Sequence, residues 1–260
     1  DDLRPLPRVP VQRELWPLVQ ALNHFTERLR GQFERQAQFI ADASHELRTP
    51  LAVLKAQLEL GLRAHEPDTW RSTLAHAVQG TDRLTHLANQ LLSLARIENG
   101  ARAIAEGGAQ LRDLSQLARE LGMAMAPLAH ARGVALALEA EHPVWMHGEP
   151  TLLNELLSNL MDNALAHTPV GGNVILRVIE PAVLEVEDDG PGIPYEDRER
   201  VFERFYRRNP MVAGSGLGLA IVGEICRAHV AQITLHDGAQ GGLKVRVSFV
   251  PATVARGDVR

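Results

Sequence analysis

The apolar positions of the first hundred residues follow the spacing of long amphipathic helices. Leucine and phenylalanine recur at alternating steps of three and four over residues 15–29, as in the seam of a coiled coil. After residue 29 the spacing of the apolar positions shifts by one residue, and the pattern then continues over residues 40–58. We therefore predict one helix over residues 15–63 that presents a single apolar stripe.

A second helix is predicted over residues 70–98, after a turn signalled by His65-Glu66-Pro67-Asp68. Its apolar residues form a broad face, which an antiparallel hairpin of two helices cannot bury alone. We therefore predict a homodimer in which two hairpins form a four-helix bundle. Asn99-Gly100 is expected to end this helix, and the small, polar residues up to Gln110 are expected to form a linker.

The rest of the chain mixes helical and strand patterns. Helices are expected over residues 111–131, 151–167 and 217–229. Strands are expected over residues 134–139, 144–147, 174–179, 183–188, 233–236 and 243–250. Two pairs of consecutive strands favour a mixed, partly antiparallel sheet with helices on one face. The predicted fold class is thus a helical hairpin followed by an α/β sandwich.

Composition and charge narrow the possible functions. The net charge is −5 with no basic block, and aromatic residues make up 4%, so nucleic acid is not expected as a partner. The single cysteine, Cys226, excludes an intrachain disulfide and fits a reducing compartment. No apolar run reaches the ~18 residues that a membrane span needs. Because the chain begins without methionine, we interpret it as a fragment. Whether a membrane segment precedes it is left open.

His45 is the first candidate for chemistry. It lies about 200° around the helix from the apolar positions Ala43 and Leu47, so it should face solvent. An exposed imidazole with a free lone pair is a good nucleophile, and the adjacent Glu46 can orient the ring or take its proton. Thr49 shares the face of His45. Pro50 predicts a bend one turn further on. These residues alone also fit a structural helix with a solvent-facing histidine.

A second set of residues suggests a nucleotide site. Asn159 and Asn163 are four apart on a leucine-rich helix, so their oxygens can converge on Mg²⁺. Asp188 ends a strand before Gly190-Pro191-Gly192, where the backbone can approach a planar ligand and the carboxylate can accept from an adenine amine. Taken alone, the latter segment also fits a tight acidic turn.

A glycine-rich segment, Gly214-Ser215-Gly216-Leu217-Gly218, directly precedes an apolar helix. Backbone N–H groups at the start of a helix can bind phosphate. Arg207 and Arg208 lie just before this segment and can reach phosphate, while Phe202 and Phe205 can seat a mobile loop. A glycine cluster is by itself weak evidence for a phosphate-binding site.

Together these blocks resemble the sensor histidine kinases of two-component systems. The blocks occur in the family's order: His45-Glu46-Leu47-Arg48-Thr49-Pro50, Asn159 to Asn163, Asp188-Asp189-Gly190-Pro191-Gly192, Phe202 to Phe205, and Gly216-Leu217-Gly218-Leu219. The resemblance covers roughly residues 37–250. It implies a dimerisation and phosphoacceptor hairpin, followed by an ATP-binding sandwich like that of gyrase and the heat-shock chaperone ATPases.

The resemblance also assigns roles to residues. His45 would attack the γ-phosphate of ATP with Glu46 as base, and Glu46 and Thr49 would position water when the enzyme dephosphorylates its response regulator. Asn159 and Asn163 would bind Mg²⁺ and phosphate. The remaining cofactor-binding residues would be His167, Asp188, Gly190, Gly192, Arg207, Arg208, Gly216, Leu217 and Gly218. Two departures are Glu149, where aspartate is common, and His167, where tyrosine is common. The lid, roughly residues 209–213, is short.

The implied domains are a HAMP-like linker end (1–32), the phosphotransfer hairpin (33–100), a linker (101–110), the catalytic domain (111–252) and a tail (253–260). The implied partners are a second copy of the chain and a cognate response regulator, with the membrane reached through segments absent from this chain. The chain would thus be the cytoplasmic portion of a bacterial inner-membrane protein.

Three alternatives stay open at this point. An ATP-driven conformational machine with the same nucleotide fold would hydrolyse ATP without a stable phosphoenzyme, but it gives no role to His45 and Glu46. A non-catalytic dimeric scaffold would not need intact asparagine, aspartate and glycine motifs. A kinase acting on serine would not need a histidine on the surface of a bundle.

Overall fold

The computed structural model describes residues 16–63, 67–208 and 214–252. The chain divides into two compact units, residues 1–85 and residues 86–260. The helix α2 (Pro67–Ala105) passes from the first unit into the second. Within the described ranges, no helix holds a stretch that is long and apolar enough to span a membrane.

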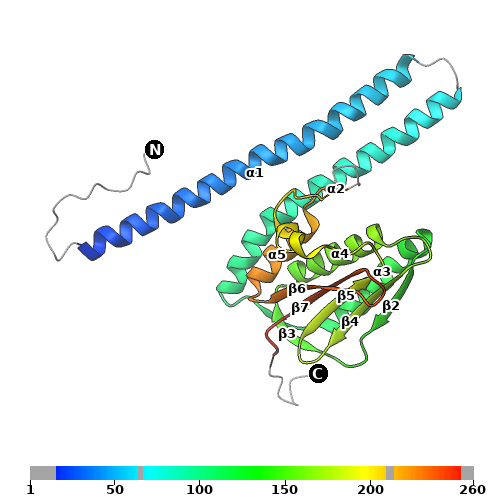
Figure 1. Cartoon of the computed structure of the whole chain (residues 1–260). Helices are drawn as coiled ribbons and strands as arrows, with labels where there is room; N and C mark the ends of the chain where they lie inside the picture. Colours follow the sequence, from blue (N-terminus) through cyan, green and yellow to red (C-terminus); the bar gives the residue numbers. More distant parts are fainter. Residues whose placement is uncertain (1–15, 64–66, 209–213, 253–260) are drawn as a thin grey trace. The chain divides into compact units, whose positions relative to one another are not determined.

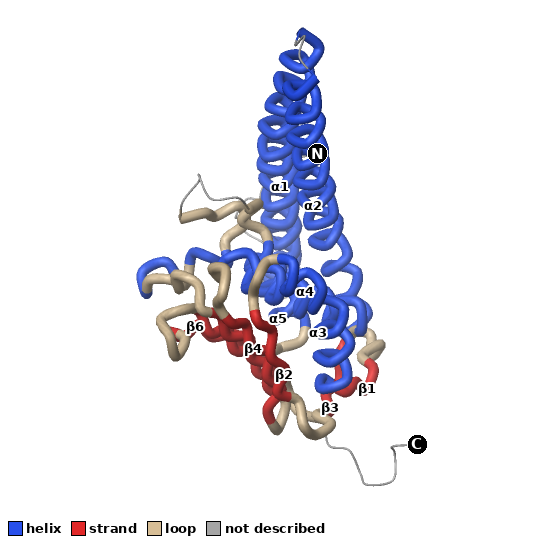
Figure 2. The backbone as a smooth tube through the Cα atoms, turned by 90° about the vertical axis from the view of Figure 1, so that its right-hand side faces the viewer, coloured by secondary structure: helices blue, strands red, loops and turns tan. Residues whose placement is uncertain are grey.

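The first unit is the predicted helical hairpin. The helix α1 (Trp16–Arg63) runs beside the first part of α2 in both views (Figures 1 and 2). The two helices touch through small residues: a Cβ on Gly61 would lie 2.5 Å from the Thr73 methyl group. The structure thus confirms the first predicted helix as far as it is described, since Leu15 lies outside the described residues. α1 continues as a single helix through Pro50.

Many large apolar side chains of this unit remain exposed in the single chain. The exposed residues of α1 are Trp16, Leu18, Leu22, Phe25, Phe33, Ile40, Leu51, Val53, Leu58, Leu60 and Leu62. Those of the first part of α2 are Trp70, Leu74 and Val78. One hairpin therefore leaves many large apolar side chains in water, and a contiguous apolar surface of this kind usually marks an interaction site.

The prediction that α2 ends at Asn99-Gly100 is wrong, because the helix continues to Ala105. Gly100 is a packing residue: a Cβ there would lie 2.6 Å from Leu152 Cδ1. The helix stops instead at Gly107, which has a φ of +86° and donates its N–H to Ile104 O at 3.1 Å. This is the left-handed glycine expected just beyond a helix end, and it shortens the predicted linker.

The second unit contains a five-stranded mixed sheet with the order β2-β4-β5-β7-β6. Its strands are β2 (Ala135–Glu139), β4 (Asn173–Ile179), β5 (Val183–Asp188), β6 (Gln232–Asp237) and β7 (Leu243–Ser248). β2 pairs with β4 in parallel, whereas the other neighbours are antiparallel. A separate antiparallel pair joins β1 (Gln110–Asp113) to β3 (Trp145–Gly148). The predicted mixed sheet is confirmed.

Three helices cover one face of this sheet (Figure 2): α3 (Leu114–Ala131), α4 (Pro150–His167) and α5 (Gly218–Ala228). The core lies between this layer and the sheet. α4 contributes the largest share of it, through Leu152, Leu153, Leu156, Leu157, Leu160, Met161, Ala164 and Leu165, all of which are buried. Two short 3₁₀ helices, Tyr195–Asp197 and Arg200–Phe202, lie between β5 and α5.

The helix predicted from residue 111 starts at Leu114, because residues Gln110–Asp113 form β1. Asp113 separates the two elements: its Oδ1 accepts the N–H groups of Ser115 at 2.9 Å and Val144 at 3.0 Å. The first bond caps α3 and the second holds the segment that leads into β3. Leu111, which its spacing assigns to the helix, therefore lies in β1, and the spacing alone did not reveal this strand.

Buried His229, at the end of α5, fixes the start of α4. Its Nδ1 donates to Ile225 O at 2.9 Å, and its Nε2 accepts the Glu149 N–H at 3.1 Å. A carbonyl only accepts and an amide N–H only donates, so this ring is neutral with its hydrogen on Nδ1. Glu149 in turn caps α4 through Oε2, which accepts the Leu152 N–H at 2.6 Å.

This arrangement predicts a pH dependence of stability. Burial lowers the pKa of His229, whereas the unfolded chain takes up this proton near pH 6.5. The contribution of neutral His229 is therefore complete above that pH and is lost as the pH falls below it. In urea denaturation, the His229→Gln variant should show a lower midpoint above pH 6.5 and a smaller loss below it. The exposed His236 supplies the control variant His236→Gln; equal pH dependence in both variants would contradict the assignment.

Candidate functional site

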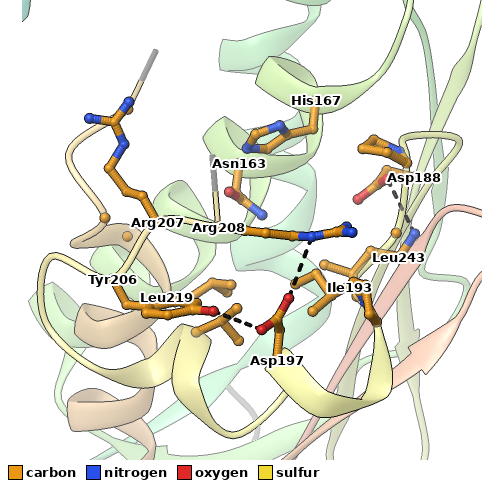
Figure 3. Close-up of a pocket in the computed structure, with 17 residues that line it drawn as sticks. Asn163, His167, Asp188, Ile193, Asp197, Tyr206, Arg207, Arg208, Leu219 and Leu243 are labelled. Carbon is orange, nitrogen blue, oxygen red and sulfur yellow. Dashed lines mark hydrogen bonds and ion pairs between the residues drawn. The ribbon is translucent and has the colours of Figure 1, made fainter. Parts of the chain in front are cut away.

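The second unit contains a cavity of about 650 Å³ (Figure 3). It is bounded by the last turns of α4, the end of β5, the two 3₁₀ helices, and the segments that flank the undescribed residues 209–213. Its walls are formed by Asn163, His167, Asp188, Pro191, Gly192, Ile193, Pro194, Asp197, Val201, Tyr206, Arg207, Arg208, Gly214, Gly216, Gly218, Leu219 and Leu243. Of the predicted binding residues, those absent from this wall are Asn159, Gly190 and Leu217.

Asp188, 5% exposed, lies at the end of β5 and faces the cavity. Its Oδ1 accepts the N–H group of Gly190 at 2.8 Å. The same oxygen accepts the N–H group of Leu243 at 3.3 Å (Figure 3). Burial raises the pKa of this carboxyl group, and the two backbone bonds partly oppose that change. Because both bonds use Oδ1, the second carboxylate oxygen is left for a donor on a ligand.

Gly190 packs closely between Asp188 and the end of α4. A Cβ at this position would lie 2.7 Å from Asp188 Oδ1 and 3.0 Å from His167 O. A larger residue would therefore push the carboxylate or the end of α4 out of place. Gly190 thus belongs to the site as a support for Asp188 rather than as part of the wall.

The glycine-rich segment lies directly before α5, as predicted. Gly216 has a φ of +69°, and a Cβ on it would lie 2.7 Å from Tyr206 O, so glycine is required here on both counts. Leu217 is fully buried at the N-cap of α5 and offers no side-chain acceptor. The first N–H groups of the helix, at Gly218 and Leu219, are thereby available to an anion in the cavity.

The two asparagines of α4 differ in their surroundings. Asn163 lines the cavity, with His167 one turn further along the helix (Figure 3). Asn159 is 8% exposed, and its Nδ2 donates to Glu155 O at 2.8 Å. Its Oδ1 faces α5, since a Cβ on Gly218 would lie 3.6 Å from that oxygen. Asn159 therefore stands behind the wall, next to the start of α5.

The described residues contain no cluster of three or more histidine, cysteine, aspartate or glutamate side chains that could hold a metal. The oxygen donors of Asn159 and Asn163 suit a different kind of site. Mg²⁺ usually takes few protein ligands, prefers oxygen, and completes its shell with water and phosphate. The residues present therefore fit a magnesium ion bound together with a phosphate ligand.

Arg208 extends across the cavity between Asn163 and the 3₁₀ helices (Figure 3), and its Nε lies 3.5 Å from Asp197 Oδ2. The Tyr206 hydroxyl donates to Asp197 Oδ1 at 2.7 Å, and this bond is the main reason that the pKa of Tyr206 is raised. Arg207 also lines the cavity. The two arginines predicted to reach phosphate thus lie at the site.

Sequence analysis missed several wall residues. Ile193, Leu219 and Leu243 supply apolar surface, and Asp197 and Tyr206 supply a hydrogen-bonded pair. Leu219 belongs to the glycine-rich motif and Ile193 directly follows Gly192, so their place next to the site could have been predicted from the sequence. Leu243 had none, because its neighbour Asp188 is 55 residues away in sequence and is reached only through strand pairing.

His45, Glu46 and Thr49 lie on α1, in the first unit. His45 is exposed, as the helical spacing predicts, and Glu46 is partly exposed. The Thr49 hydroxyl is 3.4 Å from His45 O, a long hydrogen bond within the helix. The imidazole is therefore open to a reactant that approaches from solvent. The predicted HAMP-like seam begins outside the described residues, and the predicted lid lies outside them entirely.

Comparison with protein families gives two matches. Residues 35–100 match the His Kinase A (phospho-acceptor) domain. Residues 148–254 match the histidine kinase-, DNA gyrase B-, and HSP90-like ATPase. The first match contains the exposed His45, and the second contains the residues of the cavity wall from Asn163 to Leu243.

Curated relatives extend over nearly the whole chain. Sensor protein kinase PmrB of Pseudomonas aeruginosa is 36% identical over 258 residues, covering 96% of this chain and 53% of the relative. Sensor protein QseC of Escherichia coli is 34% identical over 258 residues, covering 96% of this chain and 55% of the relative. The histidine-protein kinase/phosphatase MprB of Mycobacterium avium is 34% identical over 263 residues, covering 96% and 48%. The chain thus spans about half the length of these relatives.

Solved structures share the fold. The Acinetobacter baumannii histidine kinase AdeS matches 80% of this chain and 98% of its own, with a TM-score of 0.59 and 23% identity. Full-length ShkA in complex with AMPPNP matches 83% of this chain and 47% of its own, with a TM-score of 0.54 and 25% identity. The two domain matches and the curated sensor kinase relatives together show that the chain belongs to the sensor histidine kinases of two-component systems.

Proposed function

We propose that this chain transfers the γ-phosphoryl group of ATP to His45 and then to an aspartate of a response regulator. The observation that carries the proposal is the combination of two features: an exposed histidine beside a glutamate on α1, and a cavity with a buried acceptor and free helix N–H groups in the second unit. A nucleotide machine without a phosphoenzyme would need only the second feature.

In this proposal the cavity binds ATP with the adenine against its apolar side. The exocyclic amine donates to the free oxygen of Asp188, and Ile193 and Leu219 contact the ring. The phosphates extend toward Asn163 and the start of α5, where backbone N–H groups favour negative charge. Arg207, Arg208 and His167 add donors around them, and Arg208 must leave Asp197 to do so.

Asn159 and Asn163 would hold Mg²⁺ through their carboxamide oxygens. A bound magnesium ion neutralises phosphate charge as the phosphoryl group is transferred. The chain itself supplies the remaining catalysis by positioning, since phosphoryl transfer has a loose transition state that demands little covalent help from the protein.

The phosphoryl step uses the groups on α1. A nitrogen of the His45 ring forms a bond to the γ-phosphorus while the bond from this phosphorus to the bridging oxygen breaks, and ADP leaves. The proton displaced from the ring passes to Glu46. In a second step, a carboxylate of the response regulator takes the phosphoryl group from His45. Glu46 and Thr49 would position water if the same enzyme dephosphorylates the regulator.

The proposal extends to the assembly and its place in the cell. The exposed apolar residues of the hairpin are proposed to pair with a second copy in a four-helix bundle. The proposed domains follow those of the sequence except at the linker, which is shortened because α2 ends at Ala105 and β1 begins at Gln110: HAMP-like linker end 1–32, hairpin 33–105, linker 106–109, catalytic domain 110–252 and tail 253–260. The chain is proposed to be the cytoplasmic portion of an inner-membrane sensor kinase; it spans about half the length of its curated relatives.

His45 is tested by phosphoryl labelling. Incubation with Mg²⁺ and ATP labelled at the γ-phosphate should leave label on the protein that acid removes and base does not, as expected for a phosphorus–nitrogen bond. The His45→Gln variant should carry none. His76, also exposed on the hairpin, supplies the control variant His76→Gln, which should label normally. Label that survives His45→Gln would refute the assignment.

Asp188 is tested by nucleotide binding. Asp188→Asn keeps an oxygen for the backbone bonds but replaces the free acceptor with an amide donor. Loss of a hydrogen bond to a charged acceptor should weaken ATP binding about tenfold or more by isothermal titration calorimetry. The exposed Glu196 supplies the control variant Glu196→Gln, which should bind ATP like the unmodified chain. Unchanged affinity in Asp188→Asn would mean that the adenine lies elsewhere.

The dimer is tested on the hairpin surface. Leu74 is 55% exposed on α2, so Leu74→Glu should leave the helix folded but place charge in the proposed interface. Analytical ultracentrifugation should show a dimer for the unmodified chain and a shift toward monomer for Leu74→Glu. Asp188→Asn should remain dimeric; a monomer in that variant would show that the domains are misassigned.

A further inference from the structure

We infer that Glu155 is a positioning residue for Asn159, and that Ser93 of α2 holds Glu155 in place. The inference rests on the proposed function, in which the Asn159 oxygen binds Mg²⁺. It adds two residues, on α4 and on the second half of α2, whose contacts determine which end of the Asn159 carboxamide faces the metal.

The orientation of the Asn159 carboxamide follows from its partners. Its Nδ2 donates to the backbone carbonyl of Glu155 at 2.8 Å and lies 3.4 Å from the Glu155 carboxylate oxygen Oε1. Both groups only accept hydrogen bonds, so the nitrogen must face Glu155. The oxygen therefore faces the opposite way, toward Gly218 and the start of α5, where the phosphates are proposed to bind.

The Glu155 carboxylate is itself held from α2. The hydroxyl of Ser93, 4% exposed, donates to the same Oε1 in a short hydrogen bond. Ser93 Oγ also lies 3.0 Å from Asn89 O, but the bond to the carboxylate is the stronger because its acceptor is charged. Glu155 thus connects the buried face of α2 to the asparagine one turn further along α4.

The same face of α2 reaches the other side of the proposed phosphate site. Gln90, one turn before Ser93, accepts a hydrogen bond from the Ser215 hydroxyl at 2.5 Å. Ser215 Oγ also accepts the Leu217 N–H at 3.1 Å. α2 therefore contacts both the glycine-rich segment and the support of Asn159. The position of the α2 segment that holds Gln90 and Ser93 bears directly on the groups that would surround Mg²⁺ and phosphate.

The expected effect is on metal affinity. If the carboxamide turned around, its NH₂ group would face the cation, and the site would lose one of its two protein ligands. Groups that orient a metal ligand typically contribute about 10- to 100-fold to metal affinity when they are removed. The backbone bond to Asn159 survives any substitution of Glu155, so the effect of the side chain should lie near the lower end of that range.

The test measures the binding of a non-hydrolysable ATP analogue to the full chain at increasing Mg²⁺ concentration, and again in EDTA. Glu155→Ala should raise the midpoint of the Mg²⁺ dependence about tenfold and leave the affinity in EDTA unchanged. Glu155→Gln keeps an acceptor oxygen and should stay close to the unmodified chain. Ser93→Ala should shift the midpoint in the same direction by a smaller factor.

Two exposed positions supply matched controls. Glu120 on α3 accepts a hydrogen bond from Gln116 on the same helix, so Glu120→Ala should not shift the midpoint. Ser72 on α2 bonds to Thr69 O in the same way, so Ser72→Ala is the control for Ser93→Ala. Thermal denaturation of each variant reports whether a change in binding reflects a loss of folding.

The outcomes separate this inference from the proposed function. An unshifted midpoint in Glu155→Ala, or an equal loss of affinity with and without Mg²⁺, overturns the inference alone. Failure of the unmodified chain to bind the analogue overturns the proposed function and the inference with it. If Glu155→Ala does not fold, Ser93→Ala decides: a raised midpoint supports the inference, and an unchanged one overturns it.

Discussion

The structure of the second unit depends on the burial of one helix. α4 packs eight apolar side chains against the sheet and its neighbours, and this burial fixes the rotation of the helix about its axis. Once that rotation is fixed, Asn163 and His167 must face the cavity and Asn159 must face the start of α5. At the start of α4, the hydrogen bonds of Glu149 and His229 set the position of the helix along its axis. At the other end, Gly190 packs closely against the last turn, since a Cβ on it would lie 3.0 Å from His167 O.

In the proposed function, the nucleophile His45 and the nucleotide site lie on different units, and this separation limits the hydrolysis of ATP by water. A cavity that binds ATP and positions water near the γ-phosphate would tend to hydrolyse it, whereas a nucleophile mounted elsewhere reacts only when the units meet. α2 belongs to both units, and Gln90 and Ser93 in its second half contact Ser215 and Glu155. A change in the hairpin therefore has a physical route to the groups around the proposed phosphate site.

Much of the fold follows from local pattern. The spacing of apolar residues predicts the long helices, and alternation predicts the strands, because both depend on which residues of one segment can be buried together. Gly100 shows where this reasoning fails: a glycine after asparagine is a typical stop signal, but here it is needed for contact with Leu152, which no local pattern reveals. β1 was missed for the same reason, since its partner β3 is distant in sequence.

The candidate site divides in a similar way. Asn163, Asp188 and the glycines were found because their residue types and spacing suit a nucleotide. The apolar wall at Leu243 and the Tyr206–Asp197 pair were not, because only the fold brings them together. Glu155 and Ser93 likewise carry no motif, and their role rests entirely on contacts between helices.

The central claim is that ATP phosphorylates His45, and the most direct measurement is the site of phosphorylation itself. After incubation with Mg²⁺ and ATP, digestion at neutral pH and mass spectrometry of the peptides should place the phosphoryl group on the histidine of Ala43-Ser44-His45-Glu46. A phosphoryl group on Ser44 or on any other residue, or hydrolysis of ATP with no phosphopeptide, would contradict this account.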